Sequence, residues 1–195
     1  MTSKPGRDMR PNNGVTLNVD CDGVIADFVG QLVILSAFRF SFMDIDKYDH
    51  PLLTKELITR ALHEPETYKY LFPVQNARPA LRGLYASGYR IHIATNRNPK
   101  TTEYLVNWLA LWGIPYDDLT LLGFANKDKN VAGGDILVDD KPVNVNSYAD
   151  AGIGQAILFS QPWNEHDWIS PAVERVRGWD KTVQAIRRIK EGLHA

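Results

Sequence analysis

The feature that most constrains this chain is a short apolar run, Val15 to Val19, that ends on two aspartates one residue apart, Asp20 and Asp22. The run has the composition of a strand buried on both faces of a parallel sheet. Ionised carboxylates are costly inside such a sheet, so the chain must leave it near Asp20. Gly23 permits this turn because glycine adopts backbone conformations that other residues avoid. We therefore expect both carboxylates at the carboxyl end of a strand, where open α/β sheets bind ligands.

Paired carboxylates at such a position can perform phosphoryl transfer. One can attack as a nucleophile and form an aspartyl-phosphate, and the other can protonate the leaving oxygen and later activate water. Their oxygens also suit Mg²⁺, which binds through one or two carboxylates plus substrate phosphate. A solvated turn and a calcium loop are the alternatives. The calcium loop is disfavoured because Gln31 occupies its twelfth position, where a bidentate acid is needed.

Composition limits the classes of protein that remain. The chain has 195 residues, enough for one sizeable core with an inserted subdomain. Its 22 basic and 23 acidic residues disfavour a nucleic-acid platform, so we expect no stable nucleic-acid partner. No apolar run approaches the ~18 residues of a membrane span, and we expect residues 1–14 to form a flexible arm. Cys21 is the single cysteine, which favours a cytoplasmic location; we expect it to be a buried filler rather than a nucleophile.

Apolar patterns predict a doubly wound, mostly parallel α/β sheet. Helical spacing indicates helices over 25–38, 79–87, 100–112, 143–150 and 172–193, the last broken near Gly178, and apolar runs indicate further strands over 89–94, 116–124, 135–138 and 155–159. Such alternation is typical of a sheet with right-handed crossovers. Residues 39–77 are too many for a simple connection of about 2 to 6 residues. We expect them to form an inserted helical cap on a core of 15–38 and 78–195.

Aromatic residues are concentrated in and beside this cap. They could contact a flat substrate group, although for any single one a place in the cap's own core is favoured. The candidates for substrate contact are Phe28, Phe40, Phe42, Tyr70 and Phe72.

Two later strands also end in polar residues. Thr95 and Asn96 follow the second strand and precede a helix that starts near Pro99, so a hydroxyl and free N–H groups could hold a phosphate there; alone, Thr95 is more often a helix-entry residue. Asp139 and Asp140 end a later apolar run. Two further acids beside the first pair would repel it strongly without a cation, so we infer a metal held jointly by the two strands.

These residues together resemble the haloacid dehalogenase superfamily of phosphohydrolases. Its four motifs match in order, at residues 20–24, at Thr95, at Lys129 and at Asp139–Asp140. Within the superfamily the chain is similar to the 5′(3′)-deoxyribonucleotidase group in residues 22–28, 71–73, 128–129 and 161–164, and at Trp108. The resemblance covers residues 15–189 and implies a Rossmann-like core with a small cap.

The resemblance also implies a role for each matched residue. Asp20 would be the nucleophile and Asp22 the general acid and base. Mg²⁺ would be held by the Asp20 carboxylate, the Asp22 backbone carbonyl and the Asp139–Asp140 pair, with Asp140 as direct ligand and Asp139 acting through water. The phosphate group would be bound by Thr95, the backbone of Asn96 and Lys129.

Two positions depart from the family pattern. Asn96-Arg97 replaces the small residue and proline that often follow the threonine, so Arg97 either contacts phosphate or caps the helix. Lys127 lies close to Lys129 and is a second candidate for the phosphate-binding lysine.

The function that follows is that of a Mg²⁺-dependent phosphomonoesterase acting on nucleoside monophosphates through an aspartyl-phosphate. Its partner would be a small-molecule nucleotide, and a homodimer is left open. A sugar phosphate, a polynucleotide 3′-phosphate or a phosphoprotein is the alternative substrate. A non-catalytic binding module on the same scaffold is disfavoured, because such a module would have lost an acid or the lysine, and all are present.

Overall fold

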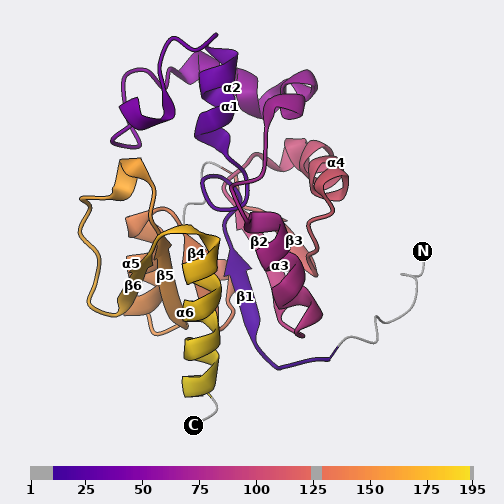
Figure 1. Ribbon diagram of the computed structural model, residues 1–195, viewed down its shortest axis with the longest axis vertical. Coiled ribbons are helices and arrows are strands. Elements are labelled where there is room, and N and C mark those ends of the chain that lie inside the picture. Colours follow the sequence, from indigo (N-terminus) through magenta and orange to yellow (C-terminus); the bar gives the residue numbers. More distant parts are fainter. Residues whose placement is uncertain (1–10, 124–128, 194–195) are drawn as a thin grey trace.

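The computed structural model describes residues 11–123 and 129–193. Its centre is a sheet of six parallel strands in the order β3-β2-β1-β4-β5-β6 (Figure 1). The strands are β1 (Thr16–Val19), β2 (Arg90–Thr95), β3 (Asp118–Leu121), β4 (Ile136–Asp139), β5 (Gln155–Phe159) and β6 (Val173–Val176). Because β1 pairs with β2 on one side and with β4 on the other, the carboxyl ends of these three strands meet beside Asp20.

Helices cover both faces of the sheet, as the consecutive buried residues of its central strands require. The helices are α1 (Phe28–Leu35), α2 (Lys55–His63), α3 (Ala77–Ala86), α4 (Thr102–Trp112), α5 (Pro142–Asp150) and α6 (Gly178–Leu193). In β4, Val138 belongs to the apolar cluster that also contains residues of α3, α4 and α6, whereas Leu137 belongs to the cluster formed with α5. The predicted doubly wound α/β fold is therefore confirmed.

The predicted C-terminal helix over 172–193 is wrong in its first part. Residues Val173–Val176 form β6, which pairs with β5, and α6 begins only at Gly178, whose φ is +74°. Val173 and Val176 are three residues apart, a spacing that a helix also shows. The sequence pattern alone could not separate these two states in so short an edge strand.

The first helix begins later than predicted. Asp27 is its N-cap, with Oδ1 accepting a hydrogen bond from the Gly30 N–H at 2.9 Å, so α1 starts at Phe28 instead of Ile25. The helix ends at Leu35, and Phe38 lies beyond it with φ +58°.

The segment between α1 and α3 lies above the carboxyl ends of the strands (Figure 1). It contains the 3₁₀ turns η1 (Phe42–Asp44) and η2 (Pro65–Tyr70) and the helix α2, which Thr54 caps through its hydroxyl. Val29 and Leu32 of α1 belong to the same apolar cluster as Ala61 of α2. The helix α1 thus packs with the cap, and the boundary between 38 and 39 stays a prediction.

Within residues 11–123 and 129–193, no helix combines the length and the apolarity needed to cross a bilayer.

Candidate active site

A cavity of about 710 Å³ lies between the carboxyl ends of the strands and the cap. The sheet side of its wall carries polar residues, whereas the cap side is mostly apolar and includes Phe28, Leu32 and Ile58. The polar residues on the sheet side include Asp20, Asp22, Thr95, Asn96, Arg97, Lys129 and Asp140.

Three buried carboxylates converge, and two of them, Asp20 and Asp140, line this cavity. Asp20, Asp139 and Asp140 each offer an oxygen, and these oxygens lie within 4.8 Å of one another. The neighbouring strands β1 and β4 bring them together, because the Asp20 N–H donates to the Val138 carbonyl at 2.9 Å. Burial, with repulsion from Asp139 and Asp22, raises the pKa of Asp20 to about 6 against the pull of Lys129. Burial and the two neighbouring acids also raise the pKa of Asp140 well above its ordinary value.

The Asp140 carboxylate is only half satisfied. Its Oδ2 accepts a hydrogen bond from Trp163 Nε1 at 2.8 Å, whereas the buried Oδ1 has no hydrogen-bond partner among the described residues. In Asp139 both oxygens are used, by the Lys141 N–H at 2.8 Å and by Asn144 Nδ2 at 2.9 Å. A buried acceptor without a partner beside two more carboxylates fits a hard cation such as Mg²⁺.

Among the described residues, Lys129 reaches the acids. Its Nζ contacts the Asp20 carboxylate and the Ala94 carbonyl, and it lies 3.4 Å from Asp139 Oδ2. Burial opposes the ammonium charge, but the Asp20 and Asp139 carboxylates overcome this cost and raise the pKa of Lys129. The rival candidate, Lys127, lies outside the described residues.

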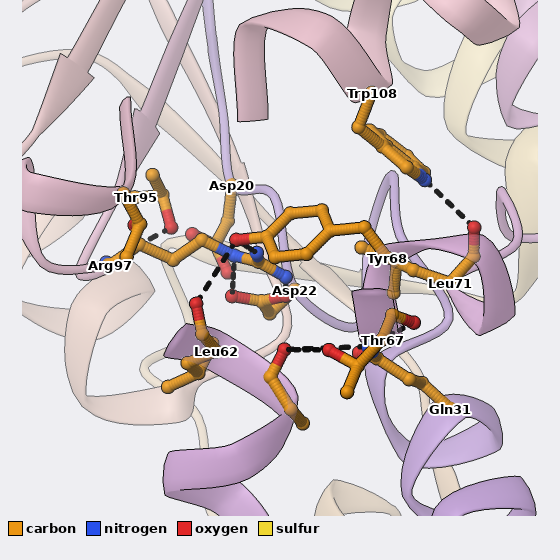
Figure 2. A network of polar contacts seen from close by, with 12 residues as sticks. Asp20, Asp22, Gln31, Leu62, Thr67, Tyr68, Leu71, Thr95, Arg97 and Trp108 are labelled. Carbon is orange, nitrogen blue, oxygen red and sulfur yellow. Dashed lines mark hydrogen bonds and ion pairs between the residues drawn. The ribbon is translucent and has the colours of Figure 1, made fainter. Parts of the chain in front are cut away.

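Asp22 is held by Arg97, for which the sequence had suggested a contact with phosphate or a helix cap. Arg97 Nε and Nη2 donate to the two oxygens of Asp22 at 2.9 and 2.6 Å, and Nη1 donates to the Tyr68 hydroxyl at 2.6 Å. Figure 2 shows the guanidinium between these two side chains. The Thr95 hydroxyl accepts a hydrogen bond from the Arg97 N–H at 3.3 Å, and Asn96 lines the cavity beside it.

Gly23 allows the metal-site acids to approach the turn after β1. Its φ is +81°, and a Cβ built on it would lie 2.4 Å from Asp140 Oδ2. The Gly23 carbonyl accepts a hydrogen bond from Gln161 Nε2 at 2.5 Å. The glycine is therefore required by both backbone conformation and space.

The cap residues proposed as substrate contacts lie in different places. Phe28 lines the cavity. Phe40 is buried in the cap cluster, and the Phe42 ring packs on Trp163. Tyr70 and Phe72 are 36% and 47% exposed. Substrate contact by these residues stays a prediction, which the cavity wall supports best for Phe28.

The structure also supplies site residues that sequence reasoning missed. The Tyr48 hydroxyl donates to the Asp140 carbonyl, and Asn164 Nδ2 donates to the same oxygen at 2.6 Å. Asn144 holds Asp139 from the first turn of α5. The family resemblance had singled out residues 161–164, but nothing local to Tyr48 or Tyr68 indicates a contact with the site.

Comparisons with known proteins identify relatives of this chain. Residues 13–191 match the family described as 5′ nucleotidase, deoxy (pyrimidine), cytosolic type C protein. A Chlorobaculum tepidum protein, designated a candidate 5′(3′)-deoxyribonucleotidase, is 30% identical over 173 residues, which cover 79% of this chain and 83% of the relative.

Solved structures share the fold. L-2-haloacid dehalogenase from Xanthobacter autotrophicus superposes with a TM-score of 0.60 at 12% identity, over 88% of this chain and 98% of that one. A haloacid dehalogenase-like hydrolase from Streptococcus pneumoniae gives 0.57 at 13% identity, over 89% and 99% of the two chains.

Proposed function

Because the chain belongs to the 5′-nucleotidase, deoxy (pyrimidine), cytosolic type C family, we propose that it hydrolyses nucleoside monophosphates in a Mg²⁺-dependent reaction through an aspartyl-phosphate. One observation carries the chemistry: Asp20, Lys129 and Asp140 are buried at the wall of one cavity, and the buried Asp139 lies beside them. A buried nucleophile next to a lysine and two further acids is an arrangement suited to a phosphoryl group.

The residues present fit a divalent cation. Asp20 and Asp140 would hold it directly, Asp139 would support it through water, and the Asp22 backbone carbonyl would complete the set. The free Oδ1 of Asp140 and the full hydrogen bonding of Asp139 support this division. When bound, Mg²⁺ would offset the mutual repulsion of the acids and the charge of the substrate phosphate.

The chain's own residues account for the remaining steps. The Asp20 carboxylate attacks the phosphorus, and the bond from phosphorus to the ester oxygen breaks as that oxygen takes a proton from Asp22. Lys129, Thr95 and the Asn96 backbone bind the phosphoryl oxygens during transfer. Asp22 then removes a proton from water, which attacks the phosphorus, releases phosphate and restores the Asp20 carboxylate.

A panel of phosphomonoesters tests this proposal. Nucleoside monophosphates should give kcat/KM values about tenfold or more above those of sugar phosphates, the difference that a few base contacts supply. A chelator should abolish turnover, and Mg²⁺ should restore it. Faster turnover of a sugar phosphate, a polynucleotide 3′-phosphate or a phosphopeptide would favour the alternative substrate class.

Two matched variants test the nucleophile. Asp20→Asn removes the attacking oxygen anion, so phosphate release should fall by about 10⁴-fold or more while the far-ultraviolet circular dichroism spectrum is unchanged. Asp27→Asn is the control, because Asp27 caps α1 and asparagine caps equally well. Retained turnover in Asp20→Asn would refute the assignment.

A nucleotide partner and a cytoplasmic location belong to the same proposal. The homodimer and the absence of a nucleic-acid partner stay predictions.

A further inference from the structure

We propose that Arg97 is a positioning residue that orients the Asp22 carboxylate for proton transfer to the leaving oxygen, with Tyr68 as its second anchor. The inference rests on the proposed function of Asp22 as general acid and base. It assigns Arg97 to a protein carboxylate, not to the substrate phosphate.

The contacts of Arg97 carry this inference. The guanidinium donates one hydrogen bond to each oxygen of Asp22, at 2.9 and 2.6 Å, which fixes the plane of the carboxylate as well as its position. The Arg97 side chain is 1% exposed, whereas the Asp22 side chain is 26% exposed. The arginine therefore lies behind the acid, and the acid keeps an open side toward the cavity that both residues line.

The arginine is itself fixed from the cap. Its Nη1 donates to the Tyr68 hydroxyl at 2.6 Å, and that hydroxyl donates to the Leu62 carbonyl at the end of α2 at 3.3 Å (Figure 2). The guanidinium also lies 5.3 Å from the centre of the Tyr68 ring and 5.8 Å from that of Phe28. A buried arginine held on several sides loses little freedom when it orients a carboxylate.

The positions of the two partners explain why a link is needed. Asp22 lies in the turn after β1, beyond the backbone hydrogen bond that ties Asp20 to Val138, and Arg97 is the second residue after β2. The ion pair thus ties the acid to the neighbouring strand end. A displacement of about 1 Å in a catalytic group can cost about 10²-fold in rate, so orientation by Arg97 should be visible in kinetics.

Leaving-group dependence tests the role. The proton from Asp22 is needed when an alcohol leaves, as from a nucleoside monophosphate, and much less when 4-nitrophenolate leaves. Arg97→Lys keeps the positive charge and removes the paired donors. We expect its kcat/KM on a nucleoside monophosphate to fall by on the order of 10²-fold, and on 4-nitrophenyl phosphate to fall at least about tenfold less. The ratio kcat/KM is the proper measure, because it reports the steps up to leaving-group release.

Three controls keep the test sharp. Asp22→Asn should show the same dependence on the leaving group, because it removes the proton donor itself. Tyr68→Phe keeps Arg97 and should give a weaker loss of the same kind, about three- to tenfold on the nucleotide, from one hydrogen bond. Arg90→Lys is the matched substitution, because Arg90 pairs with Asp118 at 2.6 Å on the surface and should leave kcat/KM unchanged.

Equal losses of kcat/KM on both esters in Arg97→Lys would overturn the proposal. The two esters share the phosphoryl group, so an arginine that contacts this group would affect both equally, and so would general misfolding. Equal losses in Asp22→Asn would overturn it as well. If wild-type protein cleaves 4-nitrophenyl phosphate but no nucleotide, the proposed substrate class has failed, and the same comparison with glycerol phosphate as the alkyl ester still decides the role of Arg97.

Discussion

Some residues of this site could be predicted from the sequence, and others could not. Asp20, Asp139 and Asp140 could be predicted as a group, because each follows an apolar run and strand ends of a parallel sheet meet at one edge. Arg97 could not be assigned, because its choice between phosphate and helix cap depended on a partner, Asp22, that is 75 residues away in the chain. Side-chain partners across such separations follow from tertiary packing and not from local pattern.

The raised pKa of Asp20 predicts a pH-dependent response to Mg²⁺. Without metal, folding stabilises the protonated form of Asp20, because the pKa of this residue is about 6 in the folded protein and 3.8 in the unfolded chain. Asp20 therefore adds to the free energy of unfolding below pH 3.8, and this contribution is lost as pH rises through about 6. The proposed Mg²⁺ would bind the ionised form and compete with the proton. We therefore expect the increase in Tm on adding Mg²⁺ to be small at about pH 5 and full at about pH 7.5.

Differential scanning fluorimetry at fixed ionic strength measures this difference, and NaCl at matched ionic strength is the control. An increase in Tm that is the same at both pH values would contradict the raised pKa.

At the scale of the elements, segments with a clear apolar pattern were predictable, including the four-residue strands β1 and β4, whereas the strand β6 was not. The strand β2 and the helix α4 follow their apolar patterns closely, since each buries one continuous face. The four-residue strand β6 was predicted as helix, because Val173 and Val176 are three residues apart, as on one face of a helix, although in the strand they belong to different apolar clusters. This segment is a strand because it pairs with β5 at the edge of the sheet, and that pairing depends on the arrangement of the whole sheet.

The turn after β1 yields a prediction about Gly23. Gly23→Ala should destabilise the protein by more than the ~1 kcal/mol that a left-handed alanine costs, because its Cβ would collide with the Asp140 carboxylate. Gly152→Ala is the control, since Gly152 has φ +67° and open space around its Cβ.

Urea unfolding should show the larger loss of stability in Gly23→Ala, and kcat/KM should fall on the order of 10²-fold in that variant alone. Equal behaviour of the two variants would mean that the close approach to Asp140 does not matter.

At the scale of the whole molecule, Cys21 reports on opening of the sheet. Cys21 lies between the two site acids in the sequence and is fully buried, and burial together with the Asp22 charge raises the pKa of its thiol. Labelling by a thiol reagent should therefore be on the order of 10³-fold slower in the native protein than in urea, because exposure of the site requires opening of the core.

Mg²⁺ should slow this labelling further, since it binds the folded state. Rapid labelling of the native protein, followed by absorbance of the released reporter, would show that the first strand opens without global unfolding.

The central place of β1 has a consequence for synthesis. Asp20 leaves the ribosome early, but Lys129, its ion-pair partner, follows 109 residues later, and β4 must still dock beside β1 after that. During most of translation Asp20, the proposed nucleophile, thus lacks the lysine and the two acids that surround it in the folded protein. Unfinished or truncated chains that end before β4 should accordingly be inert, so the cell is protected from stray dephosphorylation by incomplete copies of the enzyme.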